Sequence, residues 1–293
     1  MNSFFDTFYN WWKNIDKSIL FIIFTLFVLG LFFSLVSTSI IASDKLNTNS
    51  YYFFLKHLVF VTIGMFIILV FSLLNQKILL KLSIILFLFA FVTLFLVHII
   101  GIEVKGSRRW LDLGPFPRFQ PIETLKPFFV IVISMILCLD KKNLYFKYVL
   151  TILILLPNVI LLLSQPDLGQ TLLITSVWLT IIFVSGVNLI FFSFSLILIF
   201  LLTFYLIFLV PRFEYIKIRL ISFLDSSTGD NYQADKATEA ISSGGLFGKG
   251  IGEGTLNSRI PEAHTDYIMS VIAEEFGVII VIGIILIYLV FSY

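Results

Sequence analysis

Residues 78–100 read ILLKLSIILFLFAFVTLFLVHII, an apolar run in which Lys81 is the sole formally charged side chain. A helix needs about 20 mostly apolar residues to cross the hydrocarbon core of a bilayer. The run is continuous, whereas the strands of an outer-membrane barrel alternate in segments of about ten residues. The stretch therefore predicts a membrane-spanning helix.

Further runs of the same kind predict an all-α polytopic membrane protein, organised as a single membrane domain over residues 1–293. The eight predicted transmembrane helices are 18–42, 51–74, 78–100, 122–139, 144–163, 168–186, 188–210 and 264–292. The first run is too long for the apolar region of a secretory signal, and no A-x-A cleavage site follows it. Residues 1–17, rich in aromatic side chains, are expected to form an interfacial tail.

The composition supports this fold class. The chain is 59% hydrophobic and 13% charged, whereas a soluble domain averages about 45–50% apolar and about 25% charged residues. These values exclude a soluble enzyme, a disordered chain, a collagen-like fibre and a nucleic-acid binder, and the net charge of +2 implies no polyanionic partner. With Cys138 alone, a disulfide scaffold and a cysteine-based metal cluster are excluded as well.

Two long connections hold just over half of the charge. Of the 38 charged residues, six lie in 101–121 and fourteen in 211–266. The loop 211–263 contains amphipathic stretches at 216–224 and 235–241, so partial order is expected there. If the N-terminus is cytoplasmic, most cations fall outside, which contradicts the positive-inside rule. Either the N-terminus is outside, or the loops carry cations for another reason, such as an anionic substrate.

The first candidate site lies at the end of loop 101–121. Arg108, Arg109 and Arg118 gather at the membrane surface, and Glu123 and Lys126 follow on one face of the next helix. The planar arginine fork and the compact lysine ammonium both suit phosphate, so this set fits a pyrophosphate headgroup. The alternative is that the arginines anchor to lipid phosphates and Lys126 snorkels to the interface.

Two acidic residues form the second set of candidates. Asp167, in the stretch Gln165-Pro166-Asp167-Leu168, is either an ordinary helix N-cap or a residue that orients substrate. Glu274 lies within the last predicted span, where ionisable groups are costly and usually functional or paired. It is therefore a candidate for contact with substrate, and for pairing with Lys126.

The third candidate site is Pro261-Glu262-Ala263-His264-Thr265-Asp266, which leads into the last predicted span. Thr265 or Asp266 can serve simply as a helix cap. Alternatively, Asp266 is a general base that polarises a sugar hydroxyl. His264 can assist it, although a lone histidine is more often structural.

Taken together, these segments resemble the SEDS family, the membrane proteins typified by RodA and FtsW. The strongest match runs from Pro261 to Ile268 and continues through Ala273-Glu274-Glu275-Phe276-Gly277. Further matches are 106–111, 118–126, 165–169, 232–233 and 244–250. The motif Pro-Glu-Ala-His-Thr-Asp is more similar to that of the FtsW-type members, which act in cell division, because RodA-type proteins tend to have arginine in place of the alanine.

The resemblance implies a peptidoglycan glycosyltransferase that polymerises lipid II in septal cell-wall synthesis. It implies partnership with a class B penicillin-binding protein and other divisome proteins at the division septum. It also implies residence in the bacterial inner membrane, with the N-terminus cytoplasmic and both long loops, 101–121 and 211–263, extracytoplasmic. The family's catalytic aspartate falls on Asp266, and its arginine and lysine fall on Arg118 and Lys126. A divalent cation, Mg²⁺ or Mn²⁺, is left open as a cofactor.

One feature departs from the family pattern. Family members usually have ten transmembrane helices, and eight are predicted here, so the chain is expected to be a C-terminally truncated member that lacks the last two. Two other functions stay open: a lipid II flippase, which would favour a charged site at mid-membrane, and a non-catalytic division scaffold.

Overall fold

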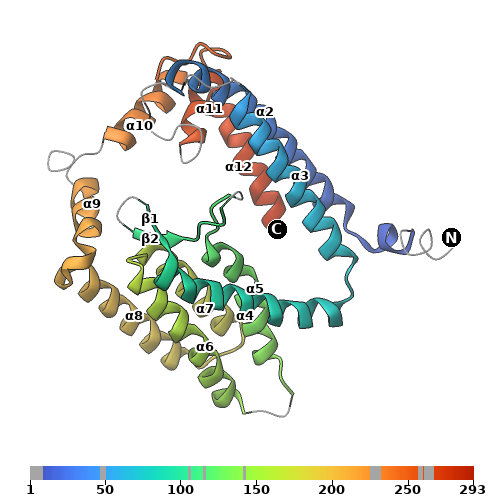
Figure 1. Cartoon of the computed structure of the whole chain (residues 1–293), viewed down its shortest axis with the longest axis vertical. Helices are drawn as coiled ribbons and strands as arrows, with labels where there is room; N and C mark the ends of the chain where they lie inside the picture. The colour runs from blue at the N-terminus through green and yellow to red at the C-terminus, as the bar shows by residue number, and fades with distance from the viewer. Residues whose placement is uncertain are drawn as a thin grey trace. The chain divides into compact units, whose positions relative to one another are not determined.

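The computed structural model describes residues 9–46, 51–104, 107–114, 117–140, 143–224, 232–256, 260 and 267–293. They form two compact units, and the organisation as a single membrane domain stays a prediction. Unit 1 comprises Met1–Leu73 and Ser226–Tyr293, and unit 2 comprises Leu74–Asp225. Figure 1 shows that nearly all the regular structure is helical.

Five helices of the described residues are long and apolar enough to cross a membrane. They are α2 (Lys17–Leu46), α3 (Tyr52–Leu73), α4 (Gln76–Ile100), α6 (Leu144–Ser164) and α8 (Leu189–Leu209). Two shorter helices, α5 (Pro121–Leu137) and α7 (Leu168–Val184), coincide with predicted spans. The polytopic helical fold is confirmed, while the count of eight spans stays a prediction.

The helices of unit 2 begin where short polar side chains cap them. Asn75, Asn143, Asp167 and Asn188 each accept a hydrogen bond from a backbone amide in the first turn of α4, α6, α7 and α8 respectively. Such caps satisfy amides that have no partner within the helix. They explain why the helix starts lie within two residues of the predicted ones.

The core of unit 2 lies between α4, α5, α6 and α7. Its fully buried side chains include Leu94 on α4, Phe129 and Ile133 on α5, and Leu162 on α6. By contrast, α8 has no buried residue, and its apolar side chains are exposed. Exposed apolar surface of this extent is expected of helices in contact with lipid.

Loop 101–121 contains a small sheet, which the all-α prediction missed. Strands β1 (Ile102–Val104) and β2 (Ser107–Trp110) pair antiparallel, and an isolated bridge joins Leu111 to Phe119. The strands have only three and four residues, too few for a periodic pattern to appear. Their pairing provides hydrogen-bond partners for backbone groups at the end of the helical core.

Unit 1 contains α2, α3, α10 (Tyr232–Gly244), α11 (Ile268–Phe276) and α12 (Val278–Ser292). The prediction of one continuous span over 264–292 is wrong, because Gly277 separates α11 from α12 with φ 85° and ψ 168°. That backbone conformation favours glycine. Phe33 of α2 packs with Ile272 and Ile284 on the two helices.

The partial order expected in loop 211–263 is confirmed. The loop begins with η1 (Pro211–Phe213), its first amphipathic stretch lies in α9 (Glu214–Leu224), and its second lies in α10. The described part of the loop therefore contains regular structure outside the long apolar helices.

Candidate active site

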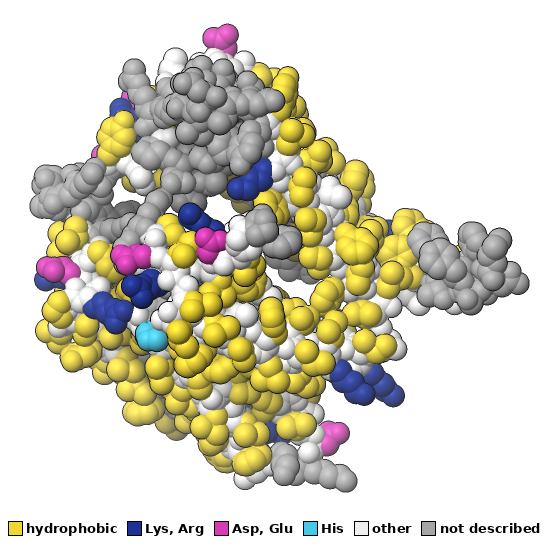
Figure 2. Space-filling view, viewed as in Figure 1, with side chains coloured by type: hydrophobic (Ala, Val, Ile, Leu, Met, Phe, Trp, Pro, Cys, Tyr) yellow, Lys and Arg dark blue, Asp and Glu magenta, His cyan; other side chains and the backbone are white. Residues whose placement is uncertain are grey.

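In unit 2, polar side chains gather where the β hairpin, α5 and the start of α7 meet. Figure 2 shows a visible face dominated by hydrophobic side chains, with acidic and basic ones concentrated near the hairpin and α9. The site contains Arg109 of β2, Glu123 and Lys126 of α5, and Asp167 at the start of α7. The sequence analysis predicted each of these residues.

Arg109 and Asp167 form an internal ion pair. The Arg109 Nε atom lies 3.3 Å from Asp167 Oδ2, and Arg109 Nη2 donates a hydrogen bond to the Pro166 carbonyl at 2.8 Å. Asp167 is nearly buried and also caps α7 by accepting from the Gln170 amide. The N-cap interpretation of Asp167 is therefore confirmed, and the arginine already has two protein partners.

The turn formed by residues 164–167 is held by side chains from several elements. Tyr215 Oη donates to the Pro166 carbonyl at 2.9 Å, and Arg212 Nη2 donates to the Ser164 carbonyl. Gln165 Nε2 donates to the Leu94 carbonyl of α4 at 3.3 Å. The turn thus joins the hairpin, α4 and α9. Tyr215 and Arg212 were missed by sequence reasoning, because no local pattern indicates contacts across about 50 residues.

Lys126 and Glu123 form a second, more exposed pair. Lys126 Nζ lies 2.7 Å from Glu123 Oε2, and the side chains are 26% and 50% exposed. Gln170 Nε2 donates to the other oxygen, Glu123 Oε1, at 2.9 Å. This arrangement places a partly exposed cation near the start of α5, beside a carboxylate and an amide.

Two further arginines are exposed near this pair in the sequence. Arg108 lies 3.9 Å from Glu103 across the hairpin, and both side chains are 60% exposed. Arg118 is exposed, next to the bridge at Phe119. The predicted cationic set therefore splits into Arg109, which has internal partners, and Arg108, Arg118 and Lys126, which are at least partly accessible.

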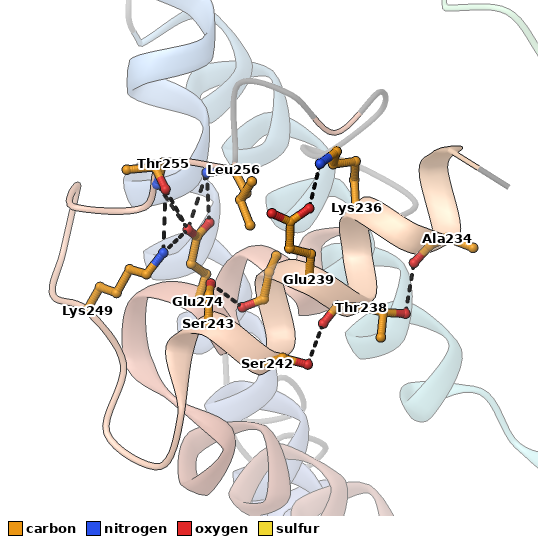
Figure 3. A network of polar contacts seen from close by, with 11 residues as sticks. Ala234, Lys236, Thr238, Glu239, Ser242, Ser243, Lys249, Thr255, Leu256 and Glu274 are labelled. Atoms are coloured by element: carbon orange, nitrogen blue, oxygen red, sulfur yellow. Dashed lines mark hydrogen bonds and ion pairs between the residues drawn. The ribbon is translucent and has the colours of Figure 1, made fainter.

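In unit 1, Glu274 is the centre of a network that we call the Glu274 clamp: Glu274, Lys249, Thr255 and Leu256 (Figure 3). Glu274 is completely buried. Its Oε1 atom accepts from Lys249 Nζ at 2.8 Å, from the Thr255 amide at 3.0 Å and from the Leu256 amide at 3.2 Å. The suggested pairing of Glu274 with Lys126 is thus wrong, since each has another partner within its own unit.

Lys249 and Thr255 were not singled out from the sequence. A lysine inside the glycine-rich stretch 244–250, in a chain that also has a carboxylate within an apolar span, was the available signal. His264 and Asp266 lie outside the described residues. Among those that are described, no three His, Cys, Asp or Glu side chains come together as a metal-binding group.

The family model for the cell cycle proteins FtsW, RodA and SpoVE matches residues 17–293. The chain belongs to this family. Among its relatives, the probable peptidoglycan glycosyltransferase FtsW of Caulobacter vibrioides is 32% identical over 272 residues, covering 92% of this chain and 68% of the relative. The protein of the same name from Coxiella burnetii is 35% identical over 269 residues, covering 87% of this chain and 70% of the relative.

Solved structures agree with the family assignment. A chain from a peptidoglycan synthase complex, whose description concerns the coordination of polymerization and crosslinking, matches with TM-score 0.72 and 26% identity over 95% of this chain and 76% of its own. The rod shape determining protein RodA of Thermus thermophilus matches with TM-score 0.64 and 25% identity, over 96% of this chain and 73% of its own. This chain therefore has the same fold as these FtsW/RodA-type structures.

Proposed function

We propose that this FtsW/RodA family member is a peptidoglycan glycosyltransferase that polymerises lipid II during septal cell-wall synthesis. The observation that carries the proposal is the similarity, over about nine-tenths of the chain, to several FtsW proteins that bear the name of that activity. The partly exposed Lys126–Glu123 pair supports it, because it supplies a cation where a membrane-bound pyrophosphate headgroup would lie.

The proposed mechanism uses Asp266 as a general base. Asp266 takes the proton from the 4-hydroxyl of the acceptor sugar, whose oxygen then attacks the anomeric carbon of the growing chain. The bond from that carbon to the pyrophosphate oxygen breaks, and undecaprenyl pyrophosphate leaves. Arg118 and Lys126 stabilise the negative charge that develops on the leaving group. Arg108 is a further contact, whereas Arg109 and Asp167 hold the 164–167 turn in place.

The proposal includes the remaining family expectations. A class B penicillin-binding protein is the proposed partner, the bacterial inner membrane at the septum is the proposed location, and both long loops face outward. Among the described residues, no three His, Cys, Asp or Glu side chains form a group that could hold a metal. A Mg²⁺ or Mn²⁺ ion accompanying the pyrophosphate stays a proposal, and loss of activity on adding EDTA would support it.

The test is polymerisation of purified lipid II by the protein together with its penicillin-binding partner. We expect glycan strands from the wild type and none from Asp266→Ala. Polymer formation by Asp266→Ala at the wild-type rate would contradict the assignment of the base. Transport of lipid II across vesicle membranes without polymer would favour a flippase, and rescue of division by the Asp266 variant would favour a scaffold.

A further inference from the structure

Gln170, in the first turn of α7, connects that helix to Glu123 of α5, which lies 47 residues earlier in the sequence. Its Nε2 atom donates to Glu123 Oε1 at 2.9 Å, while Lys126 Nζ lies 2.7 Å from the other oxygen, Glu123 Oε2. The carboxylate therefore lies between an amide of α7 and an ammonium group of its own helix. Because each oxygen has its own partner, the amide orients the carboxylate that contacts Lys126.

The backbone that carries Gln170 is itself held in place. The Gln170 amide donates to Asp167 Oδ1 at 3.3 Å, and Asp167 is paired with Arg109 of β2. In addition, α5 and α7 contribute buried side chains to the same core cluster of unit 2. By contrast, Glu123 is half-exposed and Lys126 is partly exposed, and long exposed side chains have many rotamers available. Gln170 thus links a mobile type of side chain to a fixed part of the fold.

This contact leaves one atom of Gln170 unsatisfied. Among the residues that the structure describes, the buried Oε1 atom has no hydrogen-bond partner. A buried polar atom without a partner lowers the stability of a protein, so an apolar side chain of the same length should be tolerated at this position. Local losses of this kind are expected at functional sites. The contact of the Nε2 donor with Glu123, rather than the stability of the fold, therefore explains a glutamine here.

We propose that Gln170 is a positioning residue, which holds Glu123 and thereby keeps the Lys126 ammonium group in place for a pyrophosphate headgroup. The inference rests on the proposed function, in which Lys126 contacts that headgroup. A lysine side chain loses rotamer freedom when it binds a ligand, and ordering it beforehand removes part of that loss from the binding free energy. Gln170 acts through Glu123 and makes no contact of its own with substrate.

The exposure of the pair allows a ligand to replace it. Exposed ion pairs contribute little free energy, and Glu123 is half-exposed. A pyrophosphate carries more negative charge than a carboxylate, so it can draw the ammonium group of Lys126 away from Glu123 Oε2. Gln170 still holds the carboxylate by its other oxygen. The lysine therefore starts from one defined place and returns to it when the ligand leaves.

The experiment measures equilibrium binding of lipid II to the protein in lipid nanodiscs, in a double-mutant cycle of Gln170→Met and Lys126→Met. Methionine keeps the length of glutamine and removes the donor. Gln76→Met, at an exposed position at the start of α4, is the matched control. Gln170→Met should weaken binding about 2- to 10-fold, the equivalent of ordering one long side chain. Its unfolding midpoint should match that of the control or exceed it.

The second half of the cycle separates positioning from a structural role. In the Lys126→Met background, Gln170→Met should weaken binding no further, because the lysine that it positions is absent. A residue that merely supported the fold would lower the affinity by the same factor in both backgrounds, and would lower the unfolding midpoint as well.

A second measurement needs no substrate. Reductive methylation of Lys126, followed by mass spectrometry, reports how firmly its ammonium group is held, because the amine reacts when it leaves the carboxylate. Methylation of Lys126 should be faster in Gln170→Met than in wild type and Gln76→Met, since Glu123 is then no longer fixed.

Equal dissociation constants for wild type and Gln170→Met would overturn the inference, and so would equal losses of affinity in the two Lys126 backgrounds. Absence of lipid II binding by both wild type and Gln76→Met would instead show that the proposed function fails. The positioning of Lys126 is then judged by methylation alone, and an unchanged rate in Gln170→Met would overturn it.

Discussion

Two lysine–glutamate pairs in this protein have nearly the same geometry but different surroundings. Lys126–Glu123 in unit 2 and Lys249–Glu274 in unit 1 have N–O distances of 2.7 and 2.8 Å. The Glu123 side chain is 50% exposed, whereas that of Glu274 is not exposed at all. An exposed pair contributes about 0–1 kcal/mol and can exchange partners readily. Burial of the carboxylate, rather than the distance, therefore separates a pair available to a ligand from a pair that holds the structure.

The same distinction separates the neighbouring arginines of β2. Arg108 is largely exposed and lies at the limit of an ion pair with Glu103. Arg109 contacts the nearly buried Asp167 and the Pro166 carbonyl. Adjacent residues of one type thus have different roles, because alternate side chains of a strand point to opposite faces.

The largest loss of stability should follow from Gly277→Ala, because Gly277 packs directly against the backbone of residues 245–248. The substitution forces φ 85° on alanine and places a Cβ atom 2.2 Å from the Leu246 carbonyl oxygen. We expect destabilisation on the order of 3 kcal/mol or more, measured as the unfolding free energy in detergent. Gly283→Ala is the control: it lies in α12 with nothing within 4 Å and should be neutral or slightly stabilising. Equal stability of the two variants would contradict the close packing.

A smaller effect is expected from Arg109→Ala in unit 2. The change leaves Asp167 buried without its cation and leaves the Pro166 carbonyl with one hydrogen-bond donor fewer. We expect the free energy of unfolding to fall by about 2–3 kcal/mol. Arg108→Ala should cost less than about 0.5 kcal/mol, since it removes an exposed pair. Chemical unfolding of both variants makes the comparison. If Arg108→Ala lowered the free energy of unfolding as much as Arg109→Ala does, the distinction between an exposed Arg108 and an internally paired Arg109 would be contradicted.

The smallest effect is expected from Tyr215→Phe, which removes one of the contacts on the 164–167 turn. The hydroxyl donates to the Pro166 carbonyl at 2.9 Å, and the side chain is partly exposed. A single such hydrogen bond contributes about 0.5–1.5 kcal/mol, and the lower value is expected here. Tyr205→Phe on α8 is matched, because its hydroxyl has no hydrogen bond in the part of the chain that the structure describes. If Tyr215→Phe and Tyr205→Phe had the same unfolding midpoint, the hydrogen bond of Tyr215 would not contribute to the stability of the 164–167 turn.

The long helices could be predicted from the sequence because hydrocarbon thickness imposes a run of about 20 apolar residues. Asp167 was also recognised as a possible N-cap, since capping is a local interaction. The hairpin could not be predicted, because strands of three and four residues show no period. The break at Gly277 was missed because the apolar run continues across it, and the reason for it lies in the distant residues 245–248.

The candidate site was predicted as a list of residues but not as a set of contacts. Arg109 was a candidate because the arginine fork suits phosphate, Asp167 was either an N-cap or a residue that orients substrate, and Glu274 was a candidate because ionisable groups within a span are usually functional or paired. Whether such a residue is functional or is paired within the protein depends on partners such as Lys249 and Pro166. Those contacts form only in the folded chain. Burial and partners thus turned one list of candidates into two groups, one accessible and one internal.

The central claim is that Lys126 is available to the pyrophosphate headgroup, whereas Lys249 is not. The most direct measurement is equilibrium binding of lipid II to wild type, Lys126→Met and Lys249→Met in lipid nanodiscs. Loss of a charge-assisted contact should weaken binding by Lys126→Met about tenfold or more, and Lys249→Met should retain the wild-type dissociation constant. Weaker binding by Lys249→Met than by Lys126→Met would contradict the claim.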